Sequence, residues 1–259
     1  MNNSKIEWCD MTWNPVTGCL HSCEYCYARG IARRFSGCYD PVSDQNIKQN
    51  ENGIISLEHV GRTFYKTKKG KIMPAPYPFG FAPTFHRYRL DEPQRVKKQQ
   101  NIFVCSMADL FGEWVPDIWI EAVFEACAAA PWHRYLFLTK NPRRYCELAQ
   151  SGLLPDGKNF WWGTTATTAD SPFWSSEGHN TFLSIEPILG GFPMKALTGQ
   201  DWIIVGAMTG PKKRRYPAMR DWIMALGCNC RSLQIPLFMK NSLADICRGP
   251  LIQEFPWPS

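Results

Sequence analysis

No stretch of this sequence is apolar over the roughly 18–20 residues that a membrane-spanning helix needs. Residues 1–10 are polar and lack the apolar core of a secretory signal peptide. Internal repeats, low-complexity tracts and clear linkers are lacking as well. We therefore expect a cytoplasmic protein, with no membrane partner and with a single domain over residues 1–259.

The sequence has only a small excess of positive charge. Its 29 basic and 23 acidic residues give a formal net charge of +6. Such a balance is compatible with an anionic partner but does not demand one. Cysteine, by contrast, is abundant, with 11 residues among 259. In a cytoplasmic chain of this length, clustered cysteines indicate metal or redox chemistry more often than disulfides.

Short, nearly continuous apolar runs predict strands that are buried on both faces, as parallel strands are. The predicted strands are 12–18, 82–86, 101–106, 135–139, 159–165, 181–185, 201–206 and 235–239. Amphipathic patterns predict helices after Pro116, after Pro142 and from Met219 to Gly227. This alternation indicates an α/β fold, and so many units favour a full or partial parallel (β/α) barrel. Residues 37–80 do not fit it, and we expect an irregular insertion there.

Three cysteines with the spacing C-x3-C-x2-C, namely Cys19, Cys23 and Cys26, follow the first predicted strand. Thiolates are the usual ligands of iron–sulfur clusters, and three on one loop can leave one iron open for chemistry. The spacing leaves two alternatives, a structural zinc site that takes His21 or a flanking cysteine as fourth ligand, and a group of buried thiols. The place of the motif between a strand and a helix favours the cluster.

With an aromatic residue, Tyr25, just before the last cysteine, the motif resembles that of the radical S-adenosylmethionine (SAM) superfamily. Further stretches of the chain resemble a phage-associated family that is close to this superfamily and largely of unknown function, the three-Cys-motif proteins. The resembling stretches are 6–8, 12–19, 83–86, 106–111, 138–140, 183–187 and 202–206. The Gly-Gly-Glu segment of the superfamily is not recognisable in this chain. The resemblance implies a barrel of the radical SAM type, a relative of the TIM barrel.

The resemblance also implies a [4Fe-4S] cluster on Cys19, Cys23 and Cys26, with S-adenosyl-L-methionine bound to the open iron. In such enzymes an electron from the cluster cleaves SAM to methionine and a 5′-deoxyadenosyl radical, which abstracts hydrogen from a substrate. An external electron donor of the flavodoxin or ferredoxin type would supply the electron. Tyr25, from its place in the motif, would lie near the adenine.

Active sites of α/β barrels lie at the carboxyl ends of the strands, so we expect the polar residues there to serve the reaction. Asp109 is a candidate acceptor for the ammonium group of SAM, and Lys140 is a candidate partner for its carboxylate. The candidates for the ribose hydroxyls are Ser106, Thr164, Ser184 and Glu186. Glu186 and Lys240 directly follow apolar strands and are the predicted catalytic residues.

A basic run of Lys212, Lys213, Arg214 and Arg215 follows the seventh predicted strand and would lie on the same face. Such a run can contact phosphates, and a nucleic-acid base or nucleotide is therefore a candidate substrate. A peptide or a small metabolite is the alternative substrate.

Two other classes of protein remain open at this point. A zinc-stabilised nucleic-acid-binding protein without catalysis would use the same cysteines as a structural site. An electron-transfer protein would need a fully ligated cluster, for which Cys228 and Cys230 are the most suggestive extra pair. Buried or incidental thiols explain that pair more simply, and the barrel-like alternation favours the radical enzyme over both.

Overall fold

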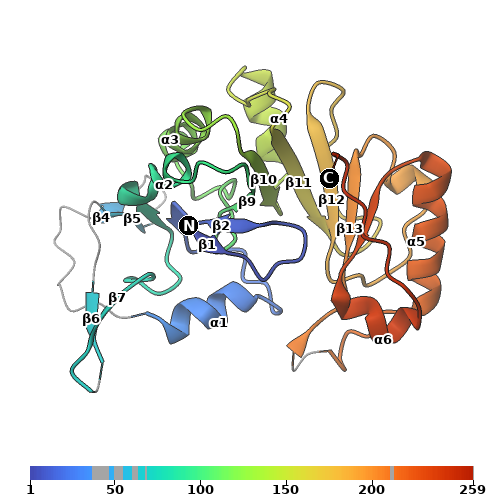
Figure 1. Cartoon of the computed structure of the whole chain (residues 1–259), viewed down its shortest axis with the longest axis horizontal. Helices are drawn as coiled ribbons and strands as arrows, with labels where there is room; N and C mark the ends of the chain where they lie inside the picture. Colours follow the sequence, from blue (N-terminus) through green and yellow to red (C-terminus); the bar gives the residue numbers. More distant parts are fainter. Residues whose placement is uncertain (37–46, 50–54, 60–63, 68, 211–212, 259) are drawn as a thin grey trace. The chain divides into compact units, whose positions relative to one another are not determined.

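The structure is a computed structural model, and it describes residues 1–36, 47–49, 55–59, 64–67, 69–210 and 213–258. Contacts divide the chain into two compact units. The N-terminal unit comprises Met1–Ser4 and Met11–Tyr135, and the C-terminal unit comprises Lys5–Asp10 and Leu136–Ser259. Figure 1 colours both along the chain. The single domain expected over residues 1–259 stays a prediction.

The first sheet of the N-terminal unit is built on β2 (Met11–Trp13). This strand pairs in parallel with β9 (Asn101–Val104) and antiparallel with β1 (Asn2–Asn3). Trp13 and Ile102 have no exposed surface, as expected for strands inside a core. The parallel pair brings the carboxyl ends of β2 and β9 to one edge of the sheet.

A second sheet of the N-terminal unit has the strand order β3-β8-β5-β4. Its strands are β3 (Val16–Thr17), β8 (Thr84–His86), β5 (Ile55–His59) and β4 (Ile47–Gln49). A separate antiparallel pair consists of β6 (Phe64–Lys66) and β7 (Ile72–Pro74). The segment predicted as an insertion, 37–80, contributes no strand to the sheet of β2, but its described residues are not irregular, because they include short paired strands. Residues 37–46, 50–54, 60–63 and 68 lie outside the described part.

Two predicted strands differ from the expectation. The strand predicted at 12–18 is split into β2 and β3, because Pro15 between them has no N–H to donate to a ladder. The strand predicted at 82–86 is β8, but it pairs with β3 and β5 rather than within the sheet of β2. A short apolar run indicates burial without specifying which sheet takes the strand.

The helices of the N-terminal unit are α1 (Tyr27–Arg34), α2 (Glu92–Arg95), α3 (Asp117–Ala128) and the 3-10 helix η2 (Arg87–Arg89). α3 begins directly after Pro116, as predicted, because proline suits the start of a helix. Its predicted apolar stripe is buried, and Ile120, Val123 and Cys127 have no exposed surface.

The strands of the C-terminal unit follow the order of the chain, β10-β11-β12-β13-β14. They are β10 (Arg134–Thr139), which begins in the N-terminal unit, β11 (Phe160–Ala166), β12 (Asn180–Ile185), β13 (Trp202–Val205) and β14 (Leu237–Met239). β11 to β14 pair in parallel. Each of these strands matches a predicted apolar run.

The register of these strands assigns their side chains to two faces. Ala166, Ile185, Val205 and Met239 stand opposite one another on neighbouring strands. They share one buried cluster with residues of α5 (Arg220–Leu233), the long helix beside β13 in Figure 1. α5 therefore covers this face of the sheet.

The other face carries an aromatic layer centred on Trp202. The rings in contact with it are Trp8, Trp161, Phe182, Phe238, Phe255 and Trp257. Gly163 leaves space for this layer, because a Cβ atom there would lie 2.2 Å from the ring of Phe182. The contacts of Trp8 account for the assignment of Lys5–Asp10 to the C-terminal unit.

The other helices of the C-terminal unit are α4 (Arg143–Gln150), α6 (Ala244–Cys247) and the 3-10 helices η3 (Met194–Ala196) and η5 (Asn241–Leu243). The predicted end of a helix at Gly227 is wrong, since α5 continues to Leu233 and ends with Gln234 at a φ of +56°. The next turn buries Cys230, and this burial offsets the roughly 1 kcal/mol by which glycine disfavours a helix.

The predicted α/β class with a mostly parallel sheet is confirmed by the strand pairing. Closure into a full or partial barrel stays a prediction. Among the described residues, no helix combines the length and apolar character needed to cross a bilayer.

Candidate functional site

The loop that carries the cysteines, residues 18–26, directly follows β3, and its first residue is joined to the segment after β9. The N–H of Gly18 donates to the carbonyl oxygen of Met107 at 2.9 Å, and Gly18 forms a parallel bridge with Ala108. Gly18 has a φ of +89°, and a Cβ atom on it would lie 2.1 Å from the carbonyl oxygen of Ala82. Only glycine fits at this position, so the start of the cysteine loop is closely specified.

The cysteine loop ends at Cys26, which is the N-cap residue of α1. Its sulfur accepts a hydrogen bond from the backbone N–H of Arg29 at 3.4 Å, and its own N–H donates to the carbonyl oxygen of Cys23 at 3.3 Å. These two bonds fix the backbone and the sulfur of Cys26 at the start of α1.

The surroundings of Cys19 disfavour its thiolate form. Burial raises the pKa of Cys19 to about 12, and the charges of Asp109, Cys23 and Cys26 also raise it, while the backbone N–H of His21 lowers it. A bound cation would offset this repulsion, so the donor set fits a metal or cluster site.

The cysteines are free thiols, and each is half-buried. Within the described residues, however, no group of at least three His, Cys, Asp or Glu side chains already surrounds a point where a metal ion could sit. The loop thus brings Cys19, Cys23 and Cys26 near one another without placing the sulfurs in a ligating arrangement. Their role as ligands stays a prediction.

Asp109 does not lie open to solvent at the end of β9. The residue is 5% exposed, its Oδ2 lies 2.7 Å from Nε2 of His21, and its Oδ1 accepts from the N–H of Phe111 at 3.0 Å. Both carboxylate oxygens are engaged by the protein. The assignment of Asp109 to the ammonium group of SAM stays a prediction, and the structure provides a different partner.

The other predicted residues of the N-terminal unit lie beside the same edge. The hydroxyl of Ser106 donates to Oδ1 of Asn14 at 3.2 Å, and its carbonyl oxygen accepts from the hydroxyl of Tyr27 at 2.9 Å. Tyr25 is half-buried, and burial, followed by the charges of Cys23 and Cys26, raises its pKa. The predicted place of Tyr25 near the adenine of SAM stays a prediction.

Sequence reasoning missed Asn14. Its Oδ1 accepts from the N–H of Met107 at 2.9 Å as well as from Ser106, and it ties the ends of β2 and β9 together. The available signal was an asparagine directly before Pro15 at the end of a strand, where side-chain bonds to backbone are common.

In the C-terminal unit the two predicted catalytic residues form an ion pair. Nζ of Lys240 lies 2.5 Å from Oε1 of Glu186, and their side chains are 18% and 33% exposed. They follow β14 and β12, so β13 runs between them, and Gly206 follows β13. A Cβ atom on Gly206 would lie 3.0 Å from both side chains, so the glycine makes room for the pair.

Replacing Lys240 by methionine is expected to lower the free energy of unfolding by about 1–2 kcal/mol, because a partly buried carboxylate loses its partner. The double variant Glu186→Gln/Lys240→Met should recover part of that loss. Urea unfolding of the double-mutant cycle measures the coupling. The matched control is the exposed pair Lys213 and Asp245, 3.8 Å apart, whose coupling should stay below about 0.5 kcal/mol. Equal couplings would contradict the prediction.

Thr164 and Ser184 are buried at the carboxyl ends of β11 and β12. The register places Thr164 beside Leu183, on the face that α5 covers, and its hydroxyl accepts from the N–H of Trp174 at 3.4 Å. Ser184 stands beside Thr165, one residue further along, and therefore faces the other side. The two predicted ribose contacts thus lie on opposite faces of one sheet.

The remaining cationic candidates lie in loops after strands. Lys140 follows β10 and is half-buried. In the basic run, Lys212 lies outside the described residues, Arg214 is exposed, and Arg215 lies over the ring of Tyr216 at 5.3 Å. A phosphate partner for this run stays a prediction.

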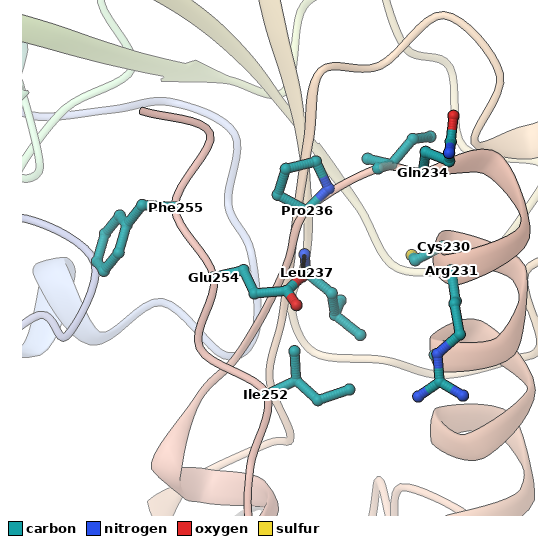
Figure 2. Close-up of a pocket in the computed structure, with 10 residues that line it drawn as sticks. Cys230, Arg231, Gln234, Pro236, Leu237, Ile252, Glu254 and Phe255 are labelled. Atoms are coloured by element: carbon teal, nitrogen blue, oxygen red, sulfur yellow. Dashed lines mark hydrogen bonds between the residues drawn. The ribbon is translucent and has the colours of Figure 1, made fainter. Parts of the chain in front are cut away.

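A pocket of about 410 Å³ opens elsewhere in the C-terminal unit (Figure 2). Cys230 and Arg231 of α5 line one side, and Ile252 and Glu254 of the C-terminal segment line the other. Because Leu237 at its floor is the first residue of β14, the pocket lies at the amino end of the strand, away from the edge where α/β proteins carry their sites. None of the predicted site residues lines it.

Cys228 and Cys230 do not form a ligand pair. Cys230 is buried, and that burial raises its pKa to about 12, while Cys228 is exposed on the same helix. Residues two apart on a helix do not face each other, so this geometry indicates incidental thiols rather than a pair of ligands.

The fold and the cysteine loop define an α/β protein with a mostly parallel sheet and a three-cysteine loop at a carboxyl strand edge. The chain belongs to the family described as "Protein of unknown function (DUF5131)", which it matches over residues 3–244. No curated protein matches it. Among solved structures, a cysteine-to-serine mutant of spore photoproduct lyase is similar at 12% identity and a TM-score of 0.45, over 83% of this chain and 61% of that protein.

Proposed function

We propose that this chain is a radical SAM enzyme in which Cys19, Cys23 and Cys26 hold a [4Fe-4S] cluster. The observation that carries the proposal is the cysteine loop itself. It starts at the carboxyl edge of a parallel strand pair, where Gly18 anchors it, and it ends as the N-cap of α1. Three half-buried thiols on one loop at such an edge are suited to a cluster with one open iron.

When bound and reduced, such a cluster supplies the electron that cleaves SAM to a reactive carbon radical. The protein residues then have three tasks in the proposal. The cysteines hold the irons, Tyr25 and Ser106 contact SAM, and the half-buried loop limits access of water. An external flavodoxin or ferredoxin would provide the electron.

For the substrate we propose a nucleic-acid base or nucleotide, bound with help from Lys213, Arg214 and Arg215. Support comes from the exposed cations in the loop after β13. Glu186 and Lys240 are the proposed catalytic residues, because their ion pair at the carboxyl ends of β12 and β14 can hold or move a proton at the Lys240 Nζ or a Glu186 oxygen.

The proposal is tested by anaerobic reconstitution with iron and sulfide, followed by dithionite and SAM. The wild-type protein should bind about four iron atoms per chain and form 5′-deoxyadenosine. Cys23→Ala should lose most of the iron and form no product above a protein-free blank, because only two thiols of the loop remain. Iron analysis, electron paramagnetic resonance (EPR) and chromatography provide the measurements.

Cys146→Ala is the matched control, since Cys146 lies on α4, outside the cysteine loop, and is likewise half-buried. It should bind iron and form product as the wild type does. A wild-type protein that stays colourless and forms no product would contradict the proposal of a radical SAM enzyme.

One observation favours a second candidate, the zinc-stabilised nucleic-acid-binding protein. A histidine that binds zinc usually has its other ring nitrogen bonded to a carboxylate, and Nε2 of His21 lies 2.7 Å from Asp109. With Nδ1 of His21 and three thiols, the loop would provide four zinc ligands. This protein would contain one zinc ion per chain, bind no SAM, and lose the zinc in His21→Ala.

A further inference from the structure

We propose that His21 and Asp109 form a positioning pair that sets the path of the cysteine loop between Cys19 and Cys23. The inference rests on the proposed function, because its purpose is to hold the thiols that would bind the cluster. His21 is the middle residue of the tripeptide that separates the first two cysteines. Its partner comes from the loop after β9, 88 residues further along the chain.

Asp109 is well suited to hold a partner in place. It is 5% exposed, and its Oδ1 accepts from the N–H of Phe111 at 3.0 Å, which fixes the plane of the carboxylate. Its backbone carbonyl accepts from the N–H of Gly112 at 3.3 Å. The remaining oxygen, Oδ2, lies 2.7 Å from Nε2 of His21. A short bond to a buried and oriented carboxylate is among the stronger side-chain contacts in proteins.

The imidazole of His21 is also held by an indole. The ring of Trp114 meets it edge to face, with centroids 4.9 Å apart and an interplanar angle of 78°. Trp114 is 8% exposed, and a Cβ atom on Gly112 would lie 2.4 Å from its ring. Gly112 therefore allows the indole to reach His21, and the same turn after β9 supplies both Asp109 and Trp114.

The fixed ring acts on the cysteines through the backbone. His21 lies two residues from Cys19 and two residues from Cys23, so a fixed position of His21 restrains the backbone on both sides of it. Ser22, next in the chain, has a φ of +56°, a conformation that a serine rarely adopts without support. Its hydroxyl bonds only locally, to the carbonyl oxygen of Leu20 at 3.3 Å. The long-range contacts of His21 with Asp109 and Trp114 therefore restrain this part of the loop, beside the bond from the N–H of Cys19 to the carbonyl oxygen of Phe81 at 3.3 Å.

The pair is tested on reconstituted protein without any activity measurement. In His21→Ala and Asp109→Ala, a chelator should remove iron about 10-fold faster than in the wild type, as for other groups that orient metal ligands. The EPR spectrum of the reduced cluster should change as well. His21→Gln should restore most of the slow release, because its amide can still donate to Asp109.

The matched control is Arg134→Ala, which removes a side-chain bond of 2.6 Å to Asn101 in the same unit, away from the cysteines. It should leave the rate of iron release and the EPR spectrum unchanged. Asp109→Asn, which keeps the bond from Phe111, replaces Asp109→Ala if circular dichroism shows that the alanine variant is unfolded.

Unchanged iron release and an unchanged spectrum in folded His21→Ala would overturn the positioning pair. So would a colourless protein that loses one zinc ion in this variant, because His21 would then be a ligand. If the proposed function itself is wrong, the wild-type protein would take up no cluster, and this result distinguishes the two failures. A lower melting temperature with unaltered iron release would indicate a merely structural contact and would also overturn the proposal.

Discussion

Gly18→Ala is expected to lower the free energy of unfolding by at least about 2 kcal/mol and to impair iron uptake. Two costs add at this position. A residue with a side chain is strained at a φ of +89°, and its Cβ would lie 2.1 Å from the carbonyl oxygen of Ala82 and 2.4 Å from the Ala82 carbonyl carbon. Because both atoms belong to the backbone, the strand edge itself must shift, and the cysteine loop would shift with it.

Gly152→Ala separates the two costs. Gly152 has a φ of +72°, but nothing lies within 4 Å of a Cβ atom there. This control should lose only about 1 kcal/mol and bind iron normally. Urea unfolding and iron analysis measure both variants. Equal losses in the two would show that the close approach to Ala82 contributes nothing.

Trp202→Ala should lower the free energy of unfolding by about 3–5 kcal/mol, the range for removal of a buried tryptophan from a core. Trp202 has no exposed surface and stands at the centre of the aromatic layer of the C-terminal unit. Its Nε1 donates to the carbonyl oxygen of Glu254 at 2.9 Å, so the substitution also leaves a carbonyl without that donor. Chemical denaturation followed by circular dichroism measures the loss.

Met219→Ala, at an exposed residue of the same unit, is the control and should change stability by less than about 0.5 kcal/mol. Trp202→Phe should fall between the two, since it keeps a ring but loses the donor to Glu254. A loss below about 1 kcal/mol in Trp202→Ala would contradict a core built on this face of the sheet.

The elements that local patterns predict are those whose signal lies within a few residues. The start of α3 at Pro116 and the buried strands β10 to β13 follow from proline preference and apolar runs. α5 was predicted from its apolar period, but its end was not. Burial of Cys230 in the turn beyond Gly227 depends on the sheet against which the helix packs.

The candidate site likewise has a part that local sequence patterns predict and a part that they do not. Spacing alone singled out Cys19, Cys23 and Cys26, and the structure places them in one loop at a strand edge. The contact of Asp109 with SAM stays a prediction, and the structure adds a bond between Asp109 and His21. No local pattern indicates a partner 88 residues away, because that contact depends on the pairing of β2 with β9.

The sequence by itself determined which side chains the protein offers, namely three closely spaced cysteines and charged groups at strand ends, and it determined the periods of its helices and strands. Only the tertiary structure decided which of these groups meet. Glu186 and Lys240 appear in the sequence as separate strand-end residues, yet they form an ion pair because β13 separates their strands and Gly206 leaves space above it. Side-chain type and local periodicity are properties of neighbouring residues, whereas strand order and register are settled by packing among residues far apart in the chain.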